Sequence, residues 1–175
     1  MLKGEQIYLR LINKSDISIL YDIYSEINVN KYNWGLKNIP DKQFILSNFY
    51  KLKNSLKSSL TIINEKKVVV GCISYDCIDK ERNIYSLSIF LGSRFWGRGY
   101  GRDSIRILSK YIFDRYKAHE IELEVVKDNE RAINCYKNIG FREKNIKNNS
   151  YNLDGNVEDI LVMVLDRNNL NKQII

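Results

Sequence analysis

Three glycines lie close together near the middle of the chain, and arginines surround them. Gly97, Gly99 and Gly101 directly precede a helical pattern, and the arginines recur at every fourth position, at Arg94, Arg98, Arg102 and Arg106. Glycine permits a sharp turn and a close backbone approach, and the N-terminus of a helix presents free N–H groups and a positive dipole end. We therefore expect this turn to bind an anion such as a pyrophosphate.

Two nucleotide-binding motifs can be compared with this turn. A P-loop needs Gly-Lys followed by Ser or Thr, and the chain contains no such sequence. The dinucleotide fingerprint G-x-G-x-x-G is matched only in part, because Ser104 stands where the third glycine belongs. Since we expect only one strand-helix-strand unit, a complete dinucleotide-binding domain is not predicted.

Charge and composition limit the partners. The 175 residues carry 28 Lys and Arg against 21 Asp and Glu, a formal net charge of +7 that favours anionic ligands. Nucleic acid is not predicted, because the chain lacks a basic block, an aromatic RNA-binding signature and zinc-finger spacing. Three cysteines without a C-x-x-C pair and a single histidine argue against disulfides and a metal site. Without a secretory signal or an apolar run of about 18 residues, we expect a cytoplasmic protein that does not enter a membrane.

Hydrophobic periodicity predicts an α+β domain over residues 1–175, with its core at about 7–165. We expect helices at 15–27, with Ser15 as N-cap, from about 41 to 56, at 102–115, and at 129–139 before Gly140. We expect a loop at 28–40, and strands at 7–12, 59–63, 68–75, 84–91, 119–126, 141–151 and 157–165. Most of these strands follow one another through short turns, so the sheet should be largely antiparallel, with one strand-helix-strand crossover at its centre.

Two segments resemble motifs of the GCN5-related N-acetyltransferases (GNAT). Residues 96–101, Trp-Gly-Arg-Gly-Tyr-Gly, look like the acyl-CoA pyrophosphate loop, and residues 129–141 look like the second signature of the family. Trp96 in place of Gln or Arg is similar to the branch with ribosomal-protein-alanine and spermidine N-acetyltransferases. The element order agrees over residues 7–165. The closing Asp154-Gly155 turn, with Asp159 and Met163 beyond it, also resembles that branch.

The resemblance implies a GNAT-like mixed sheet of six to seven strands flanked by about four helices, with a central β-α-β unit that binds acetyl-CoA. The strands beside the glycine turn would splay apart, so that free backbone of the first strand pairs with the pantetheine arm. The cofactor-binding residues expected are Ile89, Phe90, Leu91, Trp96, Gly97, Arg98, Gly99, Tyr100, Gly101, Arg102, Asn129 and Asn134. Relatives also suggest a homodimer.

The resemblance makes Tyr136 the catalytic acid that protonates the CoA thiolate, a role suited to a phenol that keeps its proton at neutral pH. The identity of the general base stays open. Residues 85–88, Tyr-Ser-Leu-Ser, carry serines where many relatives have a carboxylate. Asp76, Glu124 or Asp159, a water-mediated route, or an amine that binds neutral remain alternatives. Cys135 is interpreted as a small buried residue and not as a nucleophile.

The acceptor should lie between the early loop and the last hairpin, where aromatic candidates are Tyr32, Trp34, Tyr75 and Tyr151. Overall basicity disfavours a polycationic acceptor unless a local acidic pocket overrides it, and a peptide α-amine or a small-molecule amine remains open. We expect direct acetyl transfer from acetyl-CoA to a primary amine. The alternative is a non-catalytic acyl-CoA-binding sensor or interaction protein.

Overall fold

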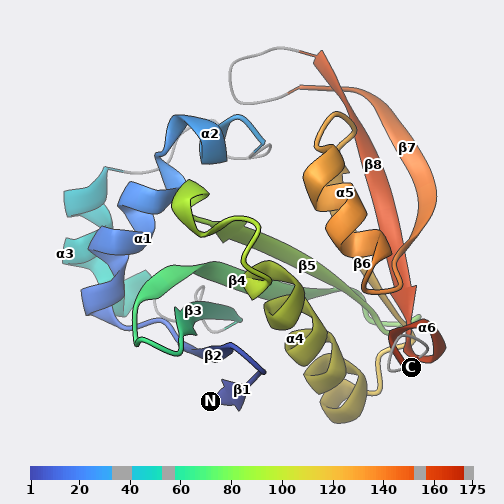
Figure 1. The fold of residues 1–175 in the computed structure, drawn as a ribbon, viewed down its shortest axis with the longest axis horizontal. Helices are drawn as coiled ribbons and strands as arrows, with labels where there is room; N and C mark the ends of the chain where they lie inside the picture. Colours follow the sequence, from blue (N-terminus) through green and yellow to red (C-terminus); the bar gives the residue numbers. More distant parts are fainter. Residues whose placement is uncertain (33–40, 53–57, 152–156, 172–175) are drawn as a thin grey trace.

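The computed structural model describes residues 1–32, 41–52, 58–151 and 157–171, and Figure 1 shows its fold. Within these residues, one sheet has eight strands in the order β1-β2-β3-β4-β5-β6-β8-β7. The expected count of six to seven strands is therefore too low. The additional strand, β1 (Leu2–Lys3), pairs with β2 over only two residues, which is too short to show an alternating pattern.

The first half of the chain forms an antiparallel meander. Its strands are β2 (Ile7–Leu11), β3 (Ser59–Asn64), β4 (Val69–Asp79) and β5 (Ile84–Leu91). The helices of this half are α1 (Ile17–Tyr24), α2 (Ile27–Asn30) and α3 (Lys42–Leu52). The expected strands are confirmed to within a few residues, and α2 lies where a loop was predicted.

The first helix starts differently from the prediction. A 3-10 turn, Lys14–Asp16, precedes α1, so Ser15 lies inside that turn and is not the N-cap. The buried Asp16 carboxylate accepts hydrogen bonds from the Asn13 N–H at 2.8 Å and the Thr61 hydroxyl at 2.9 Å. Arg10 forms an ion pair with the same carboxylate at 2.5 Å. The local bond from Asn13, the N-cap of the turn, and the contacts with Arg10 and Thr61 together hold Asp16 at the start of the helix.

The second half contains the crossover and the last hairpin. A 3-10 turn, Ser93–Phe95, leads through the glycine turn into α4 (Tyr100–Tyr116), β6 (Glu120–Val126) and α5 (Glu130–Lys137). The hairpin strands β7 (Arg142–Tyr151) and β8 (Val157–Asp166) follow, and the chain continues into α6 (Arg167–Asn171). The short helices α2 and α6 are additional to the four expected. No helix in the described ranges is long and apolar enough to cross a membrane.

Alternation along the strands assigns the helices to the two faces of the sheet. Leu87 of β5 and Leu123 of β6 belong to one buried cluster with Ile105, Leu108 and other α4 residues. The buried side of the helix predicted at 102–115 is thus part of the core. On the opposite face, the ring of Tyr24 in α1 contacts Phe90 edge-on, with 5.2 Å between ring centroids. Both faces of β5 are therefore covered, each by a different helix.

Within the described residues, the pairing of β5 with β6 is the only parallel one, and it is short. The register runs from Ile84 opposite Glu120 to Leu87 opposite Leu123 and then stops, although both strands continue. Each keeps its outer partner, because β4 pairs with β5 as far as Leu91 and β8 pairs with β6 as far as Val126. The two strands separate beyond this point (Figure 1), as expected for the splayed arrangement.

Candidate active site

A cavity of about 930 Å³ occupies the space where β5 and β6 separate. Its walls come from the ends of these two strands, the glycine turn, the start of α4, and α5. All twelve residues expected to bind the cofactor line it: Ile89, Phe90, Leu91, Trp96, Gly97, Arg98, Gly99, Tyr100, Gly101, Arg102, Asn129 and Asn134. Residues from distant parts of the sequence thus meet at one continuous space.

The glycine turn leads directly into the N-terminus of α4. Gly97 and Gly99 have φ angles of +73° and +85°, in a backbone region that residues with a Cβ atom rarely adopt. Gly99 is the N-cap of α4, and its carbonyl accepts a hydrogen bond from the Asp103 N–H at 3.0 Å. The Asp103 carboxylate in turn accepts the Gln6 N–H at 2.7 Å, which anchors the start of α4 next to β2. The first N–H groups of a helix have no intrahelical acceptors, so this end can bind an anion.

Trp96 connects the end of β5 to α5. Its indole N–H donates to the Leu91 carbonyl at 2.9 Å, and the Arg131 guanidinium lies 3.3 Å from the centroid of its ring. Burial lowers the pKa of Arg131. Sequence reasoning missed Arg131, because a cation–π contact between a turn and a distant helix leaves no spacing signal.

The helix α5 contributes the residues of the second signature. Asn129 is its buried N-cap, and the side-chain oxygen accepts the Ala132 N–H at 3.3 Å. Tyr136 also lines the cavity, with its ring 6.0 Å from that of Phe141. Burial raises the pKa of Tyr136 above its ordinary value, and no described residue hydrogen-bonds to its hydroxyl. The phenol therefore keeps its proton and can donate it to a bound molecule.

Cys135 lines the cavity beside Tyr136. Burial raises the pKa of its thiol, although the positive charges of Arg102 and Arg131 act in the opposite direction. A protonated thiol is a poor nucleophile, which agrees with the interpretation of Cys135 as a packing residue.

The other half of the cavity lies on the α1 face of the sheet. Ser88 and Glu124 are the first residues beyond the last β5–β6 pair, and both line the cavity together with Ser74 and Tyr24. The Glu124 carboxylate accepts a hydrogen bond from the Lys147 ammonium at 2.5 Å. Asp76 and Asp159, the other carboxylates considered as bases, do not line the cavity within the described ranges. Sequence reasoning missed Tyr24 and Ser74.

On this side of the cavity, the start of α2 is hydrogen-bonded to the segment before the glycine turn. Glu26, the N-cap of α2, accepts hydrogen bonds from the backbone N–H and the hydroxyl of Ser93, at 2.8 and 2.6 Å. Val29 of α2 and Tyr32 beyond it line the cavity. These bonds keep α2 close to the cavity, so the expected placement of Tyr32 near the site agrees with the structure.

The other three aromatic acceptor candidates are Trp34, Tyr75 and Tyr151. Trp34 and the side chain of Tyr151 lie outside the described residues. Tyr75 points to the α4 face, where its hydroxyl lies 3.0 Å from that of Tyr116. Side chains alternate along β4, so Ser74 faces the cavity while its neighbour Tyr75 cannot. Tyr75 is therefore not part of the described cavity lining.

The family comparison agrees with this geometry. The model of the acetyltransferase (GNAT) domain matches residues 6–142. A spermidine N(1)-acetyltransferase of Vibrio cholerae is 22% identical over 165 residues, covering 93% of this chain and 94% of that protein. A spermine/spermidine N(1)-acetyltransferase of Bacillus subtilis is 28% identical over 91 residues, which is 52% of this chain and 56% of that protein.

Solved structures show the same fold. The spermidine N-acetyltransferase of Vibrio cholerae in complex with CoA and spermine superposes with a TM-score of 0.81 at 18% identity, covering 95% of this chain and 99% of that one. A GNAT-family acetyltransferase of Bacillus anthracis gives a TM-score of 0.80 at 16% identity, covering 94% and 97%. With the domain match over most of its length, the chain belongs to the GNAT family and is an N-acetyltransferase that binds an acyl-CoA.

Proposed function

We propose that this enzyme transfers the acetyl group of acetyl-CoA to a primary amine of a polyamine such as spermidine. The observation that carries the proposal is the cavity itself, which joins the glycine turn, Tyr136 and Glu124 through the gap between β5 and β6. One half is suited to a thioester cofactor and the other to a cationic amine.

The cofactor half supplies backbone groups and positive charge. The pyrophosphate would bind at the N–H groups of Gly99 to Arg102, and the Arg98 and Arg102 side chains also line this region. The backbone of residues 89–91 faces the gap without a β6 partner, so it can pair with the amides of a pantetheine arm. These features support acetyl-CoA as the donor.

The reaction needs no covalent enzyme intermediate. A neutral amine nitrogen attacks the thioester carbonyl carbon, the carbon–sulfur bond breaks, and the departing thiolate takes the proton of the Tyr136 hydroxyl. The attacking nitrogen loses a proton to the Glu124 carboxylate, directly or through one water. The products are the amide and CoA with a free thiol.

The polyamine acceptor rests on two observations. The relatives described above are named as spermidine and spermine acetyltransferases. Glu124 places a carboxylate in the acceptor half of the cavity, where it can bind an ammonium group. The formal net charge of +7 disfavours a polycation over the surface as a whole, but a local carboxylate dominates at contact distance.

Thiol release from acetyl-CoA in the presence of different amines tests the proposal. We expect spermidine to give the highest kcat/KM in a panel that includes a peptide α-amine and an amino sugar. Release with only the peptide or the sugar would contradict the polyamine acceptor and leave the cofactor site intact. No release with any amine would contradict the proposed reaction.

A further inference from the structure

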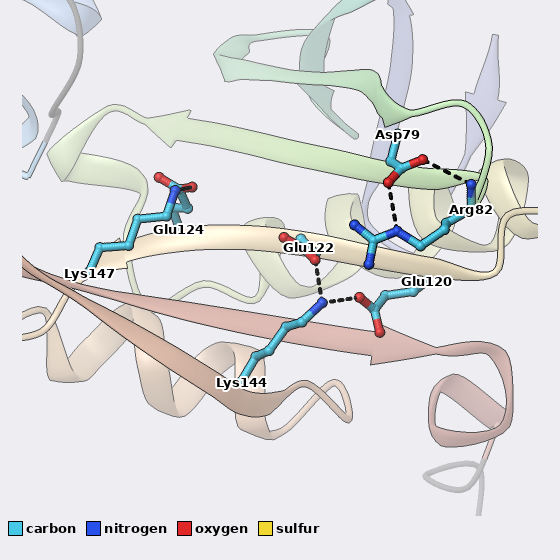
Figure 2. A network of polar contacts seen from close by, with 7 residues as sticks. All are labelled: Asp79, Arg82, Glu120, Glu122, Glu124, Lys144 and Lys147. Carbon is cyan, nitrogen blue, oxygen red and sulfur yellow. Dashed lines mark hydrogen bonds and ion pairs between the residues drawn. The ribbon is translucent and has the colours of Figure 1, made fainter.

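Two lysines of β7 reach across β8 to carboxylates of β6 (Figure 2). The Lys144 ammonium lies 2.5 Å from Glu120 and 2.6 Å from Glu122. The Lys147 ammonium lies 2.5 Å from Glu124. The same kind of ion pair thus occurs twice on one face of the sheet, between strands that are not neighbours.

A β-bulge puts Lys147 on the same face as Lys144. Arg142 is opposite Val164 in β8, and Lys147 is opposite Ile160. The two β8 residues are four apart and share a face, whereas their β7 partners are five apart. The register shift around Lys144 supplies the extra residue. Without it, the alternation would direct Lys147 to the α5 face and away from Glu124.

The two ion pairs differ in what they border. Glu124 lines the cavity, whereas Glu120 and Glu122 do not. We propose that Lys147 is a positioning residue, which holds the Glu124 carboxylate in the orientation that receives the acceptor amine. This inference rests on the proposed function, because it assigns a consequence to Glu124 in that reaction.

Replacement of Lys147 should slow turnover and at the same time strengthen binding of the acceptor. The Glu124 side chain is 31% exposed, so without a partner its carboxylate would sample several rotamers and spend less time in the productive one. The Lys147 ammonium also repels a cationic acceptor that approaches the same carboxylate. Loss of Lys147 therefore lowers kcat and lowers the KM for spermidine.

Steady-state kinetics of Lys147→Met, Lys147→Arg and Lys144→Met with spermidine and acetyl-CoA test the proposal. For Lys147→Met we expect kcat to fall about fivefold and the KM for spermidine to fall about twofold, with the KM for acetyl-CoA unchanged. Lys147→Arg keeps the charge and should restore kcat. Lys144→Met is the matched control and should leave all three parameters unchanged.

Several results would overturn the proposal. Kinetics of Lys147→Met equal to those of Lys144→Met, a rise in the KM for spermidine, or failure of Lys147→Arg to restore kcat would each do so. Thermal melting of all variants identifies loss of folded protein, which lowers apparent kcat without changing either KM. A wild-type enzyme inactive on every amine contradicts the proposed function and this inference together, whereas an active wild type with an unaffected Lys147→Met contradicts only the inference.

Discussion

The contact between β5 and β6 has two halves, which differ in whether the backbone groups of the two strands pair with each other. From Ile84 to Leu87, β5 pairs with β6, and the neighbouring Tyr75, Tyr85 and Tyr116 pack together on the α4 face. Beyond Leu87 the strands separate, and the cavity takes the place of the ladder. In the paired half, the backbone groups of one strand bond to the other strand. In the separated half, the facing backbone groups can instead bond to a ligand.

Two tyrosines illustrate this difference. Burial raises the pKa of both Tyr75 and Tyr136 above the ordinary value. The Tyr75 hydroxyl already interacts with Tyr116, whereas Tyr136 faces the cavity. A raised tyrosine pKa is therefore common to both halves, and only the position relative to the separated strands distinguishes a catalytic candidate from a structural residue.

The largest effect is expected from Tyr136→Phe. Removing the hydroxyl removes the proton source for the thiolate, so kcat should fall about 100-fold or more, with little change in acetyl-CoA affinity. Because burial raises the pKa of Tyr136, the wild-type kcat should not decline up to about pH 10, the ordinary tyrosine value. Measurement of kcat against pH for both proteins checks this. An unchanged kcat in the variant would contradict the assignment.

A large effect on stability alone is expected from Asp16→Asn, because Asp16 is not among the residues that line the cavity. Burial opposes ionisation of Asp16, but hydrogen bonds from Arg10, Asn13 and Thr61 outweigh it and lower the pKa of the carboxyl. The variant should lose about 3 kcal/mol of unfolding free energy at pH 7. A carboxyl whose pKa is lower in the folded state stabilises the fold at pH values above its unfolded-state pKa, about 3.9. This stabilisation disappears as the pH falls through the folded-state pKa.

Urea unfolding of wild type and Asp16→Asn at pH 7 and at pH 3 measures this difference. The gap in unfolding free energy should narrow at the lower pH. A gap that is equal or wider at pH 3 would show that the charge of Asp16 is not the source of the stabilisation. The KM for acetyl-CoA should be unchanged in folded protein, which separates stability from function.

Substitutions in the glycine turn should have intermediate effects. In Gly99→Val, a branched side chain must adopt φ near +85°, and its Cβ would lie 3.2 Å from the Gln6 side-chain oxygen. We expect a cost of about 2 kcal/mol and acetyl-CoA binding about tenfold weaker. In Gly97→Ala nothing lies within 4 Å of the added Cβ, so only the φ strain, about 1 kcal/mol, remains. Calorimetric titration of both variants checks the order, and a stronger effect of Gly97→Ala would contradict it.

The smallest effect is expected from Tyr75→Phe in the paired half. It removes a hydroxyl that contacts Tyr116 and keeps the ring in the tyrosine cluster. We expect a loss of stability below about 1 kcal/mol and an unchanged kcat. Thermal melting and the thiol-release assay test this. A fall in kcat comparable to that of Tyr136→Phe would remove the distinction between the two halves.

The sequence predicted those features that depend on short stretches of chain. The glycine turn, the helix that follows it and the position of Tyr136 each follow from local periodicity or motif spacing, and the structure places all of them as expected. The end of the first helix is an exception, because a helix was expected over 15–27, whereas α1 ends at Tyr24 and Ile27 is 87% exposed where α2 begins.

Features that depend on strand register were not predicted. The orientation of Tyr75 depends on the pairing of β4 with β5, and the Lys147–Glu124 pair depends on a bulge in β7. The stacking of Arg131 on Trp96 likewise joins two elements that are distant in sequence. A pattern with a period of two shows which residues alternate, but it does not show which face meets the ligand.

Calorimetric titration of the wild-type protein with acetyl-CoA, with NADH as the control, is the most direct test of the central claim that the separated half of the β5–β6 contact is an acetyl-CoA site. We expect saturable micromolar binding of acetyl-CoA, clearly weakened in Gly99→Val and unchanged in Tyr75→Phe, and no binding of NADH. Absence of acetyl-CoA binding, or equal binding by wild type and Gly99→Val, would contradict the account.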